Sequence, residues 1–137
     1  MSGDDRGQVT AFVAAMMLAL LVMAALVIDG GYALAARRRA VDEASEAARA
    51  GAQALALADY RTTGTFRLDP GAAVAAARAY LAAAGHEGQV TVAGDRVRVQ
   101  VSVSQPTALL RIVGIGQLAV AGKGEARSVR GPGSPMP

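Results

Sequence analysis

The chain opens with a long, uninterrupted stretch of apolar residues. From Val9 to Ile28 only Thr10 has a polar side chain, and no residue in the stretch is charged. A helix needs about 20 such residues, at about 1.5 Å each, to cross the hydrocarbon core of a bilayer. The pattern therefore predicts a single-pass transmembrane segment over residues 9–28, preceded by a short flank, residues 1–8.

A cleaved secretory signal is the alternative explanation of this stretch. Such signals begin with a positively charged segment followed by about 7–15 apolar residues, whereas this chain begins with Asp4, Asp5 and Arg6. Ala33-Leu34-Ala35 nevertheless has the small residues of a cleavage site. A secreted soluble binding protein, released by signal peptidase near Ala35, is therefore the alternative to a membrane anchor.

Helical spacing continues in residues 29–58. Asp29-Gly30-Gly31 marks a place for a local bend, because glycine in a helix costs about 1 kcal/mol relative to alanine. Beyond it, small and apolar residues recur at alternating steps of three and four, which places them on one helix face. This seam consists of Val41, Ala44, Ala48, Gly51, Leu55 and Ala58. Residues 9–58 are therefore predicted to form one long helix.

Small residues also recur inside the predicted membrane segment. Ala11, Ala15 and Ala19 stand four residues apart, a spacing that lets two helix backbones approach closely in lipid. Alanine is frequent throughout the chain, which is the alternative reason for the row. The predicted helix-packing residues are Ala11, Ala15, Ala19, Val41, Ala44, Ala48 and Leu55.

Residues 59–130 are expected to form a small α+β head. Residues 60–68 predict a loop or short strand, and Asp69-Pro70 begins a capped helix that Gly85 ends. Valine then alternates with polar residues on both sides of Gly94-Asp95, which predicts two strands joined by a two-residue hairpin turn. One face of this sheet is predicted to be apolar, and the other to be polar and exposed to solvent.

The rest of the head is predicted to contain a short helix and a third strand. Thr107 is expected to cap a helix over residues 108–113, and a strand over residues 117–129 is expected to break around Gly122-Lys123-Gly124. Three antiparallel strands and one or two helices make a marginal core without cysteine. The apolar sheet face is therefore expected to pack on the outer half of the long helix. The tail, residues 131–137, is predicted to be disordered.

Composition and charge narrow the classes of function. A mean hydropathy of +0.31 is high for a soluble domain. The net charge of +3 and the aromatic content of 4% argue against nucleic acid as a partner. A chain without cysteine also has no disulfide, no thiolate metal site and no lipidated cysteine.

The sequence offers no convincing catalytic, cofactor or metal site. His86, the sole histidine, lies in a GHEG loop without a second imidazole. Residues 116–124 resemble a phosphate loop, but five residues rather than four separate the glycines, and Gly124 replaces the magnesium-binding Ser or Thr. Asp29 could bind an ion, although a place among the lipid headgroups is favoured. We therefore expect a non-enzymatic protein with no catalytic residues, no cofactor and no metal.

Two segments, taken in order, resemble a known family. The first is DRGQVTAFVAAMMLALLVMAALVIDGGYALAARRRAVDEASEAARAGAQAL, and the second is VRVQVSVSQPTALLRIVGIGQLAVAGKGEARS. Together they resemble TadE/TadG-like proteins, the pilin-like membrane components of tight-adherence (Flp-type) pilus systems, in their actinobacterial form. The resemblance spans residues 5–130. It implies a minor pilin or pilus-assembly factor in the cell membrane, with the N-terminus in the cytoplasm and the head outside.

The resemblance also implies partners and a processing site. The partners would be the lipid bilayer and other pilin-like or pilus-assembly membrane proteins, with a homo-oligomer as a further candidate. In the pseudopilin members a prepilin peptidase cuts after a glycine, and a glutamate is the fifth residue of the mature chain. Here Gly7 and Gln8 would flank the cut, but Phe12 stands where the glutamate would be. The chain therefore resembles more closely the TadG-like members, which stay anchored.

The charges flanking the apolar stretch favour a different orientation. Arg37, Arg38 and Arg39 on its C-terminal side outnumber Arg6 on its N-terminal side. The positive-inside rule alone would place the head in the cytoplasm. The family orientation, with the head outside the membrane, is the one expected here.

Overall fold

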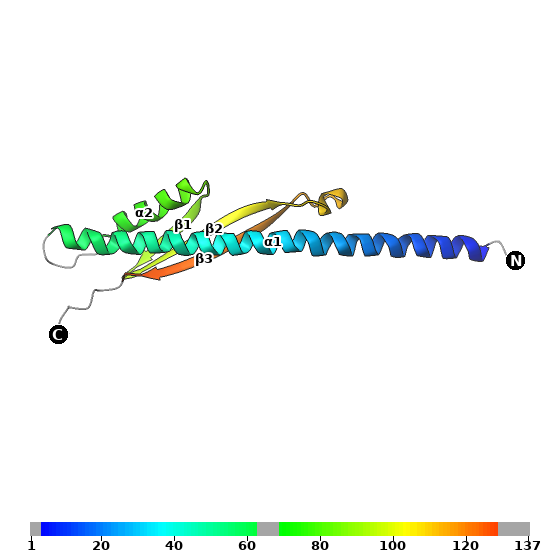
Figure 1. Ribbon diagram of the computed structural model, residues 1–137, viewed down its shortest axis with the longest axis horizontal. Helices are drawn as coiled ribbons and strands as arrows, with labels where there is room; N and C mark the ends of the chain where they lie inside the picture. Colours follow the sequence, from blue (N-terminus) through cyan, green and yellow to red (C-terminus); the bar gives the residue numbers. More distant parts are fainter. Residues whose placement is uncertain (1–3, 63–68, 129–137) are drawn as a thin grey trace. The chain divides into compact units, whose positions relative to one another are not determined.

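A computed structural model describes residues 4–62 and 69–128. The elements are α1 (Asp4–Thr62), α2 (Pro70–Ala83), β1 (Gly88–Ala93), β2 (Arg96–Pro106), the 3-10 helix η1 (Leu110–Val113) and β3 (Gln117–Arg127) (Figure 1). The predicted α+β fold, a long N-terminal helix with a second helix and a three-stranded antiparallel sheet, is confirmed. The predictions for residues 63–68 and 131–137 lie outside the described residues.

The first helix, α1, is a single element of 59 residues. Its backbone stays helical through Gly30 and Gly31, where the sequence marked a place for a bend. The residues on both sides are mostly alanine, leucine, methionine and arginine, which are strong helix formers. Two adjacent glycines therefore do not end the helix.

The three strands follow the order β1-β2-β3 in one sheet. Strands β1 and β2 are antiparallel, with Val90 opposite Val99 and Ala93 opposite Arg96. The two residues between them, Gly94 and Asp95, form the connection, and Gly94 has a φ of +60° that glycine adopts at little cost. The predicted two-residue hairpin turn is confirmed.

The second helix begins as the sequence predicts. The Asp69 side chain accepts hydrogen bonds from the backbone N–H groups of Gly71 and Ala72, at 2.9 and 3.3 Å. Pro70 occupies the first turn, where a missing N–H costs nothing. Gly85 follows the helix end with a φ of +77°.

Strand β3 runs without interruption from Gln117 to Arg127, so the predicted break around Gly122-Lys123-Gly124 is wrong. Gly122 and Gly124 are buried and lie on the same face of the strand. A Cβ on Gly122 would overlap backbone atoms of Ala40 and Val41, and one on Gly124 would overlap backbone atoms of Ala44 and Ser45. Glycine is needed here because the strand lies directly against the helix backbone.

The described chain divides into two compact units. Within the described residues, the first consists of residues 4–35 and 105–118, and the second of residues 36–62, 69–104 and 119–128. The core of the second unit joins alanines and Leu55 of α1, Leu81 of α2, and Val97, Val99 and Val101 of β2. The sheet therefore packs its apolar face on the long helix, as expected, while Arg98, Gln100 and Ser102 alternate on the exposed face.

Among the side chains that the structure describes, which do not include that of Ala58, the buried face of α1 differs by one position from the predicted seam. Ala44, Ala48, Gly51 and Leu55 are buried, but Val41 is 37% exposed and Ala40 is fully buried. Because the backbone of β3 approaches α1 beside Ala40, no side chain larger than a methyl group fits at that position. The seam therefore passes through Ala36 and Ala40 rather than Val41.

Candidate membrane anchor and assembly surface

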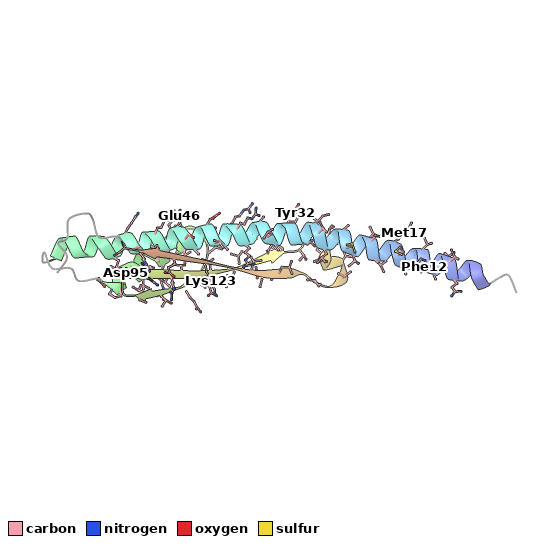
Figure 2. The ribbon with its side chains drawn as sticks, turned by 90° about the horizontal axis from the view of Figure 1, so that it is seen from below. Phe12, Met17, Tyr32, Glu46, Asp95 and Lys123 are labelled. Atoms are coloured by element: carbon pink, nitrogen blue, oxygen red, sulfur yellow. The ribbon has the colours of Figure 1, made fainter. Side chains whose placement is uncertain are left out.

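The N-terminal half of α1 exposes a continuous apolar surface. Every residue from Val9 to Ile28 is exposed except Ala25, which is half-buried. Phe12, Leu21 and Val27 are 64%, 68% and 70% exposed. Figure 2 shows Phe12 and Met17 on a part of α1 whose side chains point into open space. Soluble monomers rarely expose contiguous apolar patches larger than a few hundred Å², and α1 is long and apolar enough to cross a membrane.

The small-residue row lies on this open surface. Ala11, Ala15 and Ala19 are all exposed. Ala15 and Ala19 line a shallow apolar groove whose other lining residues are Leu18, Val22, Met23 and Leu26. The two alanines are the smallest side chains that line this groove. Gly7 and Gln8, the predicted processing residues, are exposed near the start of α1.

Asp29 directly follows the apolar stretch, and its side chain is buried within the protein. The residue is 1% exposed. Its Oδ1 accepts a hydrogen bond from the backbone N–H of Ala108 at 2.8 Å, and its Oδ2 accepts from Leu109 and Leu110 at 2.9 and 2.6 Å. A carboxylate accepts several hydrogen bonds, and each is strengthened by its charge. Asp29 therefore fastens the β2–β3 connection to α1, a role that the sequence did not predict.

This carboxylate also replaces the predicted cap of the short helix. Thr107 was the expected cap, but its hydroxyl donates to the carbonyl of Ile115. Leu109 occupies the N-cap position of η1 and makes no side-chain hydrogen bond there. Asp29 takes over the unpaired N–H groups at the start of η1. The sequence signals an acidic residue at the end of an apolar stretch, but it does not identify a partner some eighty residues later.

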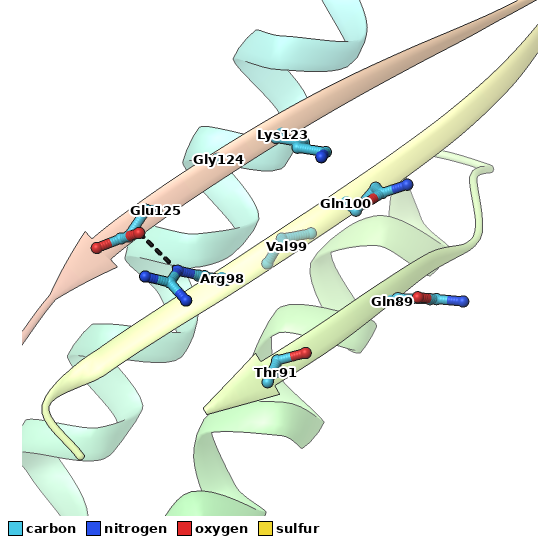
Figure 3. Close-up of a pocket in the computed structure, with 8 residues that line it drawn as sticks. All are labelled: Gln89, Thr91, Arg98, Val99, Gln100, Lys123, Gly124 and Glu125. Carbon is cyan, nitrogen blue, oxygen red and sulfur yellow. Dashed lines mark hydrogen bonds and ion pairs between the residues drawn. The ribbon is translucent and has the colours of Figure 1, made fainter. Parts of the chain in front are cut away.

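The exposed face of the sheet in the second unit carries polar side chains (Figure 3). A shallow pocket there is lined by Gln89, Thr91, Arg98, Val99, Gln100, Lys123, Gly124 and Glu125. Arg98 Nε donates to Glu125 Oε2 at 2.7 Å, which joins β2 to β3. Among the described residues, no three or more acidic or histidine side chains gather where they could hold a metal ion. The arrangement is that of a solvated sheet face.

The Arg98–Glu125 pair predicts a small acid sensitivity. The hydrogen bond from Arg98 lowers the pKa of Glu125 below its ordinary value, and the charges of Arg98 and Arg96 act in the same direction. The pair therefore contributes its full stabilisation above the ordinary carboxylate pKa of the unfolded chain, and the contribution is lost as the pH falls through the lowered value. Solvent keeps the effect small, because Glu125 is 41% exposed.

This dependence is checked by titrating the Glu125 carboxylate by NMR. Arg98→Gln is expected to raise the pKa of Glu125 toward its ordinary value. Arg78→Gln, which changes an exposed arginine of α2, is the matched control and should leave the titration unchanged. An unchanged Glu125 titration in Arg98→Gln would refute the electrostatic role of the pair.

Two residues considered for chemistry serve structural purposes. His86 lies half-buried between α2 and β1, with its Nδ1 2.8 Å from Glu43 Oε2, close enough for an ion pair when the imidazole is protonated. It is thus a contact to α1 rather than a free surface residue. Residues 117–124 of the supposed phosphate loop belong to β3, and an extended strand does not cradle a phosphate.

Comparison with known families gives one match. Residues 7–54 match the model of the TadE/G-like Flp pilus-assembly family. The match covers the apolar surface of α1 and most of the buried seam, and it ends just before Leu55. The predicted resemblance to the TadE/G-like family is confirmed over these residues. The resemblance of residues 97–128 lies outside the match and stays a prediction. Curated proteins and solved structures give no match to the chain.

Proposed function

We propose that this chain, whose residues 7–54 are TadE/G-like, is a membrane-anchored structural or assembly component of a tight-adherence pilus or secretion system. It acts by helix packing and not by catalysis. The observation that carries the proposal is the exposed apolar half of α1, which lies within the family-matched residues. A soluble environment would leave this surface in water at a cost of about 25 cal/mol per Å².

The proposed organisation assigns a role to each segment. Residues 1–8 are the N-terminal flank, residues 9–28 span the bilayer, and residues 29–58 continue the helix beyond it. Residues 59–130 form the head, and residues 131–137 are a tail. The head is proposed to lie outside the cytoplasm, as the family resemblance implies, in a single-pass protein of the cell membrane.

The orientation is testable because the chain has no cysteine. Thr91 is exposed on the polar face of the sheet, so Thr91→Cys introduces one reactive thiol on the head. A membrane-impermeant maleimide is expected to label this variant in intact cells as completely as in lysed cells. Labelling that requires lysis would place the head in the cytoplasm, as the arginines at 37–39 alone would favour.

The alternative, release of a soluble protein near Ala35, fits the contacts less well. A cut after Ala35 would fall within α1 and would remove Asp29, which holds three backbone N–H groups of the β2–β3 connection. It would leave those N–H groups, of which that of Leu110 is buried, without their acceptor. Cleavage between Gly7 and Gln8 has no such consequence, because that product keeps the apolar stretch and Asp29.

The proposed partners are the lipid bilayer and other pilin-like or pilus-assembly membrane proteins, and a second copy of the chain is also a candidate. The groove lined by Ala15 and Ala19 suits a neighbouring helix, since small residues let helix backbones approach closely in lipid. In the second half of α1, Ala44, Ala48 and Leu55 instead pack against the chain's own sheet. Lateral assembly therefore depends on the first half of the helix.

Replacing Ala15 with isoleucine is expected to fill the groove and to reduce several-fold the recovery of partner membrane proteins in native co-purification. Ala24→Ile is the matched control. It makes the same change at an exposed position nine residues away, about 180° around the helix. Equal recovery from both variants and the unmodified chain would remove the groove from the assembly surface.

A further inference from the structure

The connection between β2 and β3 carries an exposed apolar cluster at its tip. Ile112, Val113 and Ile115 are 81%, 54% and 45% exposed. They lie on or just after η1, a one-turn helix, and Arg111 beside them is exposed as well. Three large apolar side chains on a short solvated loop would form an unfavourable patch. We define residues 107–116 as the tip loop.

The tip loop is fastened at the end of the apolar stretch of α1. Asp29, which holds the loop through the N–H groups of Ala108, Leu109 and Leu110, directly follows Ile28. The loop and this part of α1 belong to the same compact unit. Figures 1 and 2 both show η1 beside α1, and in Figure 2 it lies between Met17 and Tyr32. The tip loop therefore lies level with the last turns of the apolar stretch.

The exposure of α1 agrees with this placement. Ala25 lies one turn before Asp29 on the same helix face, and it is the one half-buried residue among the exposed residues from Val9 to Ile28. Its partial burial indicates that this face of the helix is partly covered before the apolar stretch ends. The environment that surrounds the last turns of that stretch therefore also reaches the tip loop.

Most backbone N–H groups of the tip loop have hydrogen-bond acceptors within the protein. Asp29 accepts from three of its N–H groups, and those of Thr107, Ile112, Gly114 and Ile115 donate to carbonyl groups of the loop itself. The Thr107 hydroxyl also donates to the carbonyl of Ile115. Backbone groups that enter the apolar part of a bilayer must find partners within the protein. This loop meets that condition at seven of its N–H groups.

We propose that the tip loop inserts Ile112, Val113 and Ile115 into the interfacial layer of the bilayer that residues 9–28 span. The inference rests on the proposed membrane anchor and adds a second point of contact. A lipid surface is the occupant because the apolar cluster continues the apolar surface of α1, and because an adjacent arginine can reach lipid phosphates from a shallow position. Two contacts fix the rotation of α1 about its axis, which sets the direction in which the Ala15–Ala19 groove faces.

The test uses single-cysteine variants of the full chain labelled with an environment-sensitive fluorophore. Ile112→Cys places the probe on the tip loop, Met17→Cys places it in the apolar stretch, and Thr91→Cys places it on the polar sheet face. All three positions are exposed, so the labels displace no core residue. Each protein is reconstituted into vesicles of phosphatidylcholine and phosphatidylglycerol that carry nitroxide quenchers either near the headgroup or deep in the acyl chain.

The proposal predicts that the Ile112 probe emits at shorter wavelength than the Thr91 probe and is quenched most by the shallow nitroxide. The Met17 probe should be quenched most by the deep nitroxide. A Val113→Cys variant should reproduce the Ile112 result, which guards against local disruption by one substitution. If the Ile112 and Val113 probes behave like Thr91 while Met17 is quenched, the tip-loop inference is overturned and the anchor stands.

Two further outcomes separate this inference from its alternatives. If the Met17 probe is also unquenched, the membrane anchor fails and the tip-loop contact fails with it. If the Ile112 probe is shielded in native membranes but not in pure lipid vesicles, the proposal is overturned in favour of a protein partner for the apolar cluster.

Discussion

Replacing Gly124 with valine is expected to destabilise the folded second unit by more than about 3 kcal/mol, beyond the usual range for an overpacked core. A Cβ at this position would overlap backbone atoms of Ala44 and Ser45 in α1. Neither a rotamer change nor the removal of a neighbouring side chain relieves such an overlap, because the atoms belong to the helix itself. The strand and the helix would have to separate, and the valines of β2 would lose part of their burial.

The measurement is the chemical unfolding of the full chain in detergent, followed at amides of the sheet by NMR. Gly122→Val should have the same effect, since its Cβ would overlap the backbone of Ala40 and Val41. Gly116→Val is the matched control, because a Cβ there meets nothing within 4 Å. Similar unfolding midpoints for Gly124→Val and Gly116→Val would contradict the close approach of β3 to α1.

Replacing Asp29 with alanine is expected to release the tip loop from α1. The N–H groups of Ala108, Leu109 and Leu110 would lose their acceptor. At Leu110 the hydrogen bond is buried, so water does not readily replace the carboxylate there. Their hydrogen exchange should accelerate by about tenfold or more, the effect of losing one hydrogen bond to a charged acceptor. Asp29→Asn should have a smaller effect, because the amide keeps one acceptor oxygen and the size of the side chain.

Amide exchange of the full chain, measured residue by residue, tests this prediction. Asp42→Ala is the matched control, since it removes an exposed carboxylate from the same helix. If exchange at residues 108–110 is the same in Asp29→Ala and Asp42→Ala, the carboxylate does not hold the loop. The second unit should unfold normally in both variants, because its core lies in residues 44–101.

Features that depend on neighbouring residues could be predicted from the sequence. The hairpin at Gly94-Asp95 and the cap at Asp69 are local, since the turn and the cap are formed by the residues that signal them. The apolar stretch of α1 is also recognised from its own composition. These features describe how each segment folds, but they do not say which segment it contacts.

The features that depend on distant partners were mispredicted or missed. Gly122 and Gly124 suggested a break in β3, because a glycine that permits a turn and a glycine that permits close packing look alike in a sequence. The seam on α1 was placed at Val41, since steps of three and four allow either Val41 or Ala40. The close approach of β3 to α1 is what selects Ala40 as the buried residue, and that approach is not visible in the sequence. The role of Asp29 was missed because its partners are backbone N–H groups, which carry no sequence signal.

The central claim is that residues 9–28 remain in the membrane as an anchor. The most direct test is the intact mass and N-terminal sequence of the protein recovered from fractionated native cells. We predict a chain in the membrane fraction that retains these residues and begins at Met1 or Ser2, or at Gln8 if a peptidase cuts after Gly7. A soluble chain that begins near Ala36 would contradict the anchor and would make the protein a secreted binding module.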